Sequence, residues 1–450
     1  MRLADLCPAV LILGLACPAY TLAESDTVAT LEQRVAELEA ELTEARQELA
    51  RARAGSQAAR PSGIRLGPLR IGGAMRVNYV YGSYEGTDGG PSRGGDGGNV
   101  ELDTFRLEAA LDAGPWIGRL QYRWYPADAG KSYSFLHTAW LGYRWDENAQ
   151  VEVGMTRVPF GPGPFGLSHS WFFDQHYYVG LADDSDLGVK YSHRGDDWDW
   201  DLAYFWRSEP NFSGRSEDST RYGNDPVRWR ETISEEGDVS FDVRRSGYRE
   251  ANQANLRAIR KLRSDSWESD IGVSLQWGQL DGSRVDDGEH WAASLHAINR
   301  RGPWALALQL TRYGFDIDAD NPWNSDELIP LGAYDFAWPV ATEAWLPALS
   351  LSYLIETGDI PWLDSVRPYA EYSTILKEAR GQFDSDLAVL GAAWTAGAWY
   401  VYTDMAWARG NFFVGNEGDD YSRVDGVGDF GVAGNRDRHY RLNLNFGYYF

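Results

Sequence analysis

The feature that most constrains this chain is a strict alternation of apolar and other side chains in its last residues. The residues at every second position from 440 to 450 are Tyr440, Leu442, Leu444, Phe446, Tyr448 and Phe450. Polar or small residues occupy most of the positions between them. A period of two places the two sets on opposite faces of a β-strand, so that one face suits lipid and the other suits water.

The same alternation recurs along the chain and predicts about 16 strands. The predicted strands are 69–84, 100–113, 115–125, 133–145, 149–157, 186–194, 198–208, 252–264, 267–280, 289–300, 303–314, 341–356, 366–378, 384–395, 398–409 and 437–450. Tight turns, such as Gly114-Pro115 and Arg301-Gly302, alternate with long links, such as 209–251, 315–340 and 410–436. Bacterial barrels have short periplasmic turns and long external loops. We therefore predict an all-β fold, a transmembrane antiparallel β-barrel of about 16 strands, over residues 67–450.

Aromatic content and charge agree with this fold. The chain has 20 Trp, 25 Tyr and 17 Phe among its 450 residues, and a membrane barrel needs such rings at two interfaces. Beyond residue 23 no run of 18 apolar residues exists, so no helical span is expected. The net charge of −24 argues against nucleic acid as a partner.

The first residues resemble a secretory leader. Arg2 precedes an apolar stretch from Leu6 to Ala16, and small residues end at Ala23, so a signal peptide over 1–23 is expected. A lipoprotein site at Cys17 is the alternative, although Gly14 stands where leucine is usual. The only other cysteine, Cys7, also lies in this leader, so the mature chain has no thiol for a disulfide or a metal.

Residues 24–54 carry a helical heptad pattern. The apolar seam is Val28, Leu31, Val35, Leu38, Leu42, Ala45, Leu49 and Ala52. The residues flanking it would pair with opposite charge in a parallel neighbour, as Arg34 with Glu39 and Glu41 with Arg46. We predict a periplasmic coiled coil within a parallel oligomer, and a single amphipathic helix is the alternative. Residues 55–66, with Pro61 and Gly63, are a predicted linker.

Two features predict partners at the membrane. Phe450, after Tyr448 and Tyr449, resembles the aromatic C-terminal signature that the barrel-assembly machinery of the bacterial outer membrane reads. The link 315–340 is acidic and has no basic residue after Arg312. Such loops can bind the divalent ions that bridge lipopolysaccharide, or they can favour the permeation of cations.

Residues 100–194 resemble the phosphate-selective porin O and P family. The segments that carry the resemblance are "FRLEAALDAG", "FLHTAWLGYRW", "VEVGMTRVPFG" and "DSDLGVKYSH". The resemblance implies a trimeric channel of 16 strands, selective for anions, whose third external loop folds into the lumen. The matching loop here is 158–185.

The composition of the loop 158–185 suits a constriction. Prolines stiffen it, glycines allow tight folding and aromatic rings can pack against a barrel wall. The candidate constriction residues are Pro159, Phe160, Gly161, Phe165, Trp171 and Phe172. The alternative is a surface loop that shields a neighbouring subunit.

Strand parity places a set of basic residues on the inward face of the barrel. The pore-lining candidates are Arg76, Arg106, Arg119, Arg123, Arg144, Lys190, Arg207, Arg367 and Arg441. Guanidinium groups suit oxyanions, and Arg106, Arg119 and Arg123 would form a local positive cluster. Carboxylates share the same face, among them Glu108, Asp112, Glu371 and Asp404, and pairing with them would neutralise the arginines.

The sequence gives little reason to expect catalysis. Ser168, His169 and His176 stand near Asp174, but no nucleophile-elbow, metal-binding or phosphate-cradling motif accompanies them, so no cofactor is expected. We therefore predict a passive diffusion channel for small hydrophilic solutes, with anions such as phosphate favoured by the resemblance. The alternatives are a channel for cations or uncharged nutrients and a non-conducting structural barrel.

Overall fold

The computed structural model describes Arg34 and residues 63–84, 98–126, 132–209, 222–233, 239–320, 324–333, 336–411, 413–415 and 436–450. The predicted signal peptide and most of the predicted coiled coil and linker lie outside the described residues. The chain divides into two compact units, residues 1–58 and 59–450, and every strand of the described residues belongs to the second unit.

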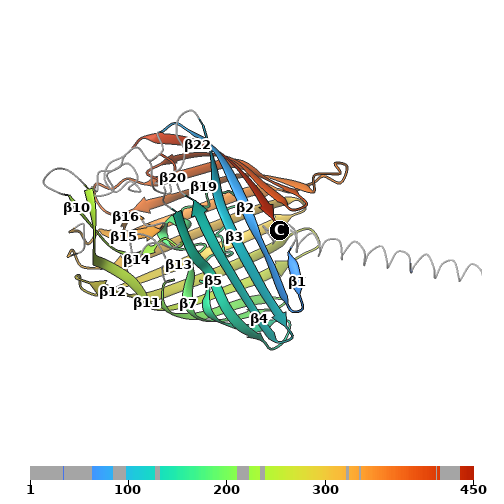
Figure 1. Cartoon of the computed structure of the whole chain (residues 1–450), viewed down its shortest axis with the longest axis horizontal. Helices are drawn as coiled ribbons and strands as arrows, with labels where there is room; N and C mark the ends of the chain where they lie inside the picture. Colours follow the sequence, from blue (N-terminus) through green and yellow to red (C-terminus); the bar gives the residue numbers. More distant parts are fainter. Residues whose placement is uncertain are drawn as a thin grey trace, which may run out of the picture. The chain divides into compact units, whose positions relative to one another are not determined.

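The second unit is a closed antiparallel barrel of 16 strands (Figure 1). The first and last barrel strands pair from Ala74↔Tyr449 to Gly82↔Arg441, which closes the ring and confirms the predicted fold class. The barrel strands are β2 (Leu69–Gly82), β3 (Asn99–Ala113), β4 (Trp116–Pro126), β5 (Ser132–Arg144), β6 (Ala149–Arg157), β7 (Ser185–Arg194), β8 (Trp198–Arg207), β11 (Val239–Arg263), β12 (Glu268–Ser283), β13 (Gly288–Arg301), β14 (Trp304–Asp316), β17 (Glu343–Tyr353), β19 (Ser365–Lys377), β20 (Ser385–Ala396), β21 (Trp399–Arg409) and β22 (Arg438–Tyr449).

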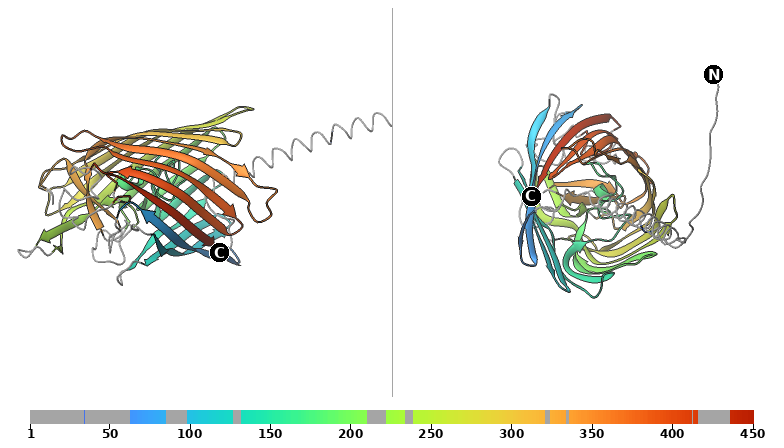
Figure 2. Two further views of the ribbon diagram at one scale, coloured as in Figure 1. Left: turned by 90° about the horizontal axis from the view of Figure 1, so that it is seen from above. Right: turned by 90° about the vertical axis from the view of Figure 1, so that its right-hand side faces the viewer.

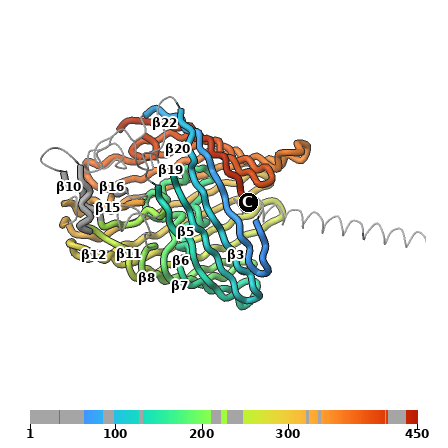
Figure 3. Tube along the Cα trace, in the orientation of Figure 1, coloured from blue at the N-terminus to red at the C-terminus, as the bar shows by residue number. Residues whose placement is uncertain are grey.

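Strand β11 departs most from its predicted bounds. It begins at residue 239, well before the predicted 252, and pairs there with β10 (Arg228–Ile233) (Figure 1). From Gly247 on it lies beside β12 (Figure 3). Its register shifts between Ala251 and Ala254, where Asn252 has a φ of 49°. The bulge breaks the regular alternation of side chains at this point, so the pattern understates the length of the strand.

Five further short strands accompany the 16 barrel strands. The short strands are β1 (Ile64–Leu66), β9 (Asp225–Pro226), β15 (Leu328–Ala333), β16 (Phe336–Ala341) and β18 (Ile355–Glu356). β1 falls in the predicted linker and pairs with β2, whereas β18 continues the line of β17. β9, β15 and β16 form a small separate sheet within two of the predicted long links.

The two faces of the barrel wall differ as the period of two predicts. On β14, Leu306, Leu308 and Leu310 are exposed, whereas Gln309 and Thr311, at alternate positions, are buried. The exposed leucines lie on the outer face, where a bilayer covers such side chains. Within the described residues, no helix is long and apolar enough to cross a membrane.

Aromatic pairs mark the end of the barrel that carries the short turns. Trp116 meets Tyr143 with 5.3 Å between ring centroids, and Trp304 meets Tyr353 at 4.7 Å. Each tryptophan follows a two-residue turn, and the second turn is set by Gly302, whose φ of 55° favours glycine. The amphipathic rings suit a membrane interface. We call this end of the barrel the short-turn end.

Candidate functional site: an inward loop and its wall

The loop of residues 158–184, which joins β6 to β7, lies inside the ring of strands (Figure 2). Its backbone and side chains bond to inward-facing groups of strands far away in the sequence. The Gly161 backbone N–H donates to Ser274 Oγ of β12 at 3.0 Å, and the Gln175 N–H donates to Ser373 Oγ of β19 at 3.0 Å. The loop therefore crosses from its own strands to the opposite wall.

Two wall carboxylates hold the middle of this loop. Glu371 Oε1 accepts the His169 N–H at 2.6 Å, and its Oε2 accepts the Ser168 hydroxyl at 2.5 Å. Asp404 Oδ2 accepts the Trp171 N–H at 2.8 Å. Both carboxylates are almost fully buried, with exposed fractions of 7% and 0%. These two residues together supply three buried hydrogen-bond acceptors to the loop.

A buried chain of polar groups fastens the loop to β14. His176 lies 2.7 Å from Asp174 Oδ1 through Nδ1 and 2.8 Å from Thr311 Oγ1 through Nε2. Burial opposes charge on Asp174, but the charge of His176 and its hydrogen bonds bring the pKa of that carboxyl below its ordinary value. All three residues are 3% exposed or less, which keeps a solute away from the hydroxyl. Asp174, His176 and Thr311 therefore attach the loop to the wall through buried hydrogen bonds.

Aromatic packing fills the space between the loop and the external link. Phe172 and Tyr178 are each 1% exposed, and the Tyr178 hydroxyl donates to the Phe172 carbonyl at 2.6 Å. The Tyr177 hydroxyl donates to the carbonyl of Tyr222, in the link between β8 and β11, at 3.2 Å. Of the remaining candidates, Phe165 lies under the Arg157 guanidinium at 4.6 Å. The loop is thus held from two sides.

The other predicted constriction residues also lie in this packed region. Pro159 and Phe160 are buried near the root of the loop. Gly161 has a φ of 69°, and its carbonyl accepts a hydrogen bond from Arg257 at 3.4 Å. Trp171 is half-buried and packs edge-on against Phe172 at 5.2 Å.

Four of the predicted pore-lining cations are paired with carboxylates of the wall. The pairs are Arg76 with Asp103 at 3.3 Å, Arg106 with Glu108 at 2.8 Å, Arg144 with Asp112 at 2.8 Å and Lys190 with Glu152 at 3.0 Å. Three of the pairs join groups of one strand or of neighbouring strands, whereas Arg144 of β5 reaches Asp112 of β3 across β4. Much of the inward positive charge is therefore compensated within the wall.

The predicted cluster of three arginines is split. Arg106 lies opposite Arg123 in the register of β3 and β4, but Arg119 lies opposite Ala110, nearer the short turn. Arg119 is exposed and donates to the Gly118 carbonyl at 2.8 Å. Arg123 is 4% exposed and lies over the Tyr222 ring at 4.4 Å. Arg207, at the end of β8, is exposed.

Two further candidates lie at the level of the loop. Arg441 is fully buried, lies over the Trp171 ring at 4.9 Å and donates to the Phe413 carbonyl at 3.2 Å. Arg367 is half-buried on β19. Among the residues that the structure describes, neither has a carboxylate within 4.0 Å.

The pKa of His169 is lowered in part by the positive charges near the inward loop. Burial, followed by the charges of Arg367 and Arg300, lowers the pKa of His169 to about 3. Its Nε2 also lies 3.3 Å from Ser352 Oγ on β17. The imidazole is therefore neutral at physiological pH, and two guanidinium charges contribute to its lowered pKa.

Protonation of His169 is expected to weaken the attachment of the inward loop to the wall. Because the pKa of His169 is lower in the anchored state than its ordinary 6.5, a released loop binds the proton more readily. Anchoring is unaffected above that ordinary value and weakens as pH falls from it toward 3. We expect the ratio of open-channel current noise at pH 4 to that at pH 7 to be smaller in His169→Gln than in the wild type, because the variant cannot take up this proton. An equal ratio in the two proteins would contradict this prediction.

The fold is similar to those of solved outer-membrane channels. The outer membrane channel DcaP of Acinetobacter baumannii shares 11% sequence identity over 87% of this chain and 100% of its own, with a TM-score of 0.52. The anion-selective porin from Comamonas acidovorans shares 9% over 85% of this chain and 99% of its own, with a TM-score of 0.50. No protein-family model and no curated protein matches the sequence. The likeness shows a barrel of the porin type and does not single out the phosphate-selective family.

Proposed function

We propose that this chain is a porin of the bacterial outer membrane, a passive diffusion channel for small hydrophilic solutes that favours small anions such as phosphate. The observation that carries the proposal is a closed barrel of 16 strands crossed by an inward loop, with cations at the level of that loop. A barrel of this strand number leaves an aqueous lumen, and diffusion through it needs no catalytic group.

The preference for anions rests on Arg367 and Arg441. Both lie on the inward face at the level of the loop, and Arg367 contributes to the lowered pKa of His169. In a narrow, partly desolvated passage a unit charge acts several-fold more strongly than in bulk water. The acidic external link lies in open solvent, where charges are screened within about 8 Å at physiological ionic strength.

A cation channel is the second candidate, because carboxylates gather at the end of the barrel opposite the short-turn end. A cavity of about 590 Å³ there is lined by Asp281, Asp287, Glu289, Asp316 and Asp318. Because many cations of the wall are paired with carboxylates, they would not oppose the negative charge of this rim. The rim would therefore attract permeating cations to the mouth of the barrel. The two candidates differ in which site, rim or loop, sets the selectivity.

Reversal potentials in a potassium chloride gradient separate these candidates. We expect the wild-type channel to prefer chloride and Arg367→Gln to lose much of that preference, because the variant removes a cation beside the loop. Arg119→Gln, which removes an exposed cation near a short turn, is the matched control and should have little effect. A cation-selective wild type would contradict the anion proposal, as would equal effects of the two variants.

We further propose the assembly that the sequence predicts: a homotrimer in contact with lipid and lipopolysaccharide, inserted by the barrel-assembly machinery, with the segment 24–54 as a periplasmic coiled coil. The heptad seam supports this proposal. Deleting residues 28–52 should weaken the oligomer and leave the barrel folded, as measured by native mass spectrometry in detergent. A monomeric full-length mature chain would refute it.

A further inference from the structure

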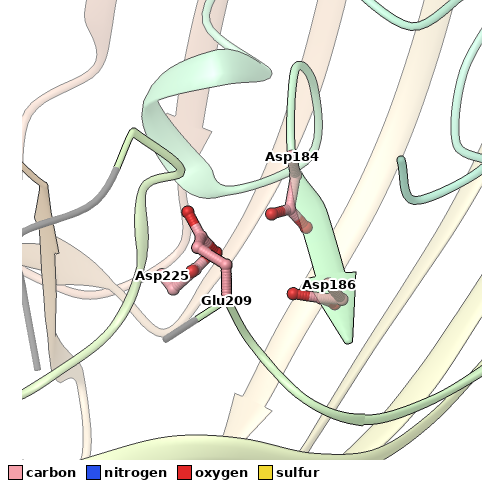
Figure 4. Close-up of side chains that lie close together, drawn as sticks. All are labelled: Asp184, Asp186, Glu209 and Asp225. Atoms are coloured by element: carbon pink, nitrogen blue, oxygen red, sulfur yellow. The ribbon is translucent and has the colours of Figure 1, made fainter. Parts of the chain in front are cut away.

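Four buried carboxylates converge beside the root of the inward loop (Figure 4). Asp184 ends the loop, Asp186 lies at the start of β7, Glu209 follows β8, and Asp225 belongs to β9 in the external link. Their exposed fractions are 5%, 0%, 5% and 1%. One oxygen from each lies within 4.8 Å of the others. Three segments of the chain therefore bring carboxylate oxygens to one point.

The side chain of Asp186 gives an independent indication of a ligand. Its Oδ2 accepts a hydrogen bond from Gln253 at 3.2 Å, but its fully buried Oδ1 has no donor among the described residues. Figure 4 shows this side chain pointing toward the other three. A buried acceptor without a partner costs about 1–3 kcal/mol, and more for a charged group, unless something else binds it.

A glycine closes the other side of this point. A Cβ on Gly223 would lie 2.9 Å from Glu209 Oε1 and 3.0 Å from Asp184 Oδ1, closer than side chains normally approach. The Gly223 N–H also donates to Glu209 Oε1 at 3.0 Å. The external link thus comes against the carboxylates only because this position has no side chain.

We propose that these four carboxylates bind one Ca²⁺ ion. Ca²⁺ takes carboxylate oxygens at about 2.3–2.6 Å, so oxygens on opposite sides of one ion lie up to about 5 Å apart. The four oxygens lie within 4.8 Å of one another, which is compatible with that sphere. Mg²⁺, with bonds of about 2.0–2.1 Å in strict octahedral geometry, would require a tighter group of oxygens.

The bound ion ties the inward loop to the external link. Asp184 holds the end of the loop, and Asp225 belongs to the small sheet of β9, β15 and β16. One ion would therefore couple the position of the loop to that of the link above it. This site is independent of the proposed function, because it concerns how the loop is held and not which solute passes.

Calorimetric titration of the full mature chain in detergent, after treatment with chelator, tests the site with Ca²⁺ alone as the probe. We expect one saturable Ca²⁺ per chain, binding at least tenfold weaker in Asp186→Asn, and weaker binding of Mg²⁺. Asp318→Asn, which removes an exposed carboxylate of the acidic rim, is the matched control and should leave this binding unchanged.

Three results would overturn the proposal: absence of saturable Ca²⁺ binding, unchanged affinity in Asp186→Asn, or Mg²⁺ binding as tight as that of Ca²⁺. Folding of each variant is verified by the heat-dependent shift in electrophoretic mobility that barrels show. If Asp186→Asn does not fold, Asp184→Asn takes its place under the same criteria. Loss of Ca²⁺ binding in Asp318→Asn would also refute the site, because the binding would then belong to the rim.

Discussion

Deletion of residues 165–178 is expected to raise single-channel conductance several-fold. These residues include the segment that crosses the lumen from Phe165 to the far wall, where Glu371 and Asp404 hold it. Without this segment the barrel wall alone limits the passage, and a barrel of 16 strands leaves a wide aqueous path. The measurement is the conductance of single channels in a planar bilayer at fixed salt concentration.

A second deletion controls for a general loosening of the barrel. Residues 379–382 form the turn between β19 and β20 at the mouth of the same barrel, and removing them leaves the inward loop in place. This control should conduct as the wild type does. If the loop deletion had the wild-type conductance, the loop would not be the constriction.

The double variant Glu371→Ala, Asp404→Ala is expected to release the loop while keeping its length. It removes the acceptors of the His169 and Trp171 N–H groups and of the Ser168 hydroxyl. A buried donor that loses its acceptor costs about 1–3 kcal/mol, so the loss of three acceptors exceeds most single substitutions. We expect current noise to rise strongly and chymotrypsin to cleave at the aromatic residues of the loop.

The matched control is the double variant Glu371→Gln, Asp404→Asn. It replaces each carboxyl group by an amide and so keeps a carbonyl oxygen at each position, and the loop should stay attached with modest extra noise. Wild-type noise together with wild-type protease resistance in the alanine variant would show that other contacts, such as His176 with Thr311, hold the loop alone.

Local patterns predicted the barrel well because a wall with lipid on one side and water on the other repeats the same chemistry in every strand. The last strand is the clearest case, since Arg441, Asn443 and Asn445 are buried inward just where their parity places them. The start of β11 was misplaced because a bulge at Asn252 shifts the register. A period of two carries no information across such a shift.

The partners of the inward residues were harder to predict. Parity placed Glu371 and Asp404 on the inward face, but nothing in the sequence showed that they receive a loop more than 190 residues earlier. The acidic cluster escaped notice for the same reason: the pattern Asp184-Ser185-Asp186 is visible, whereas Glu209 and Asp225 join it only through the path of the external link. Strand parity determines which face of the barrel wall a side chain lies on, whereas the paths of the loops determine which residues it contacts.

The central claim is that this barrel is an open diffusion channel, and the most direct test is the current through the purified full-length mature chain in a planar lipid bilayer. The chain must first be shown to be folded by its heat-dependent electrophoretic mobility. We predict stepwise insertions of uniform size, with currents that rise linearly with voltage and with salt concentration. Folded protein that inserts into the bilayer and gives no conductance steps would contradict the claim.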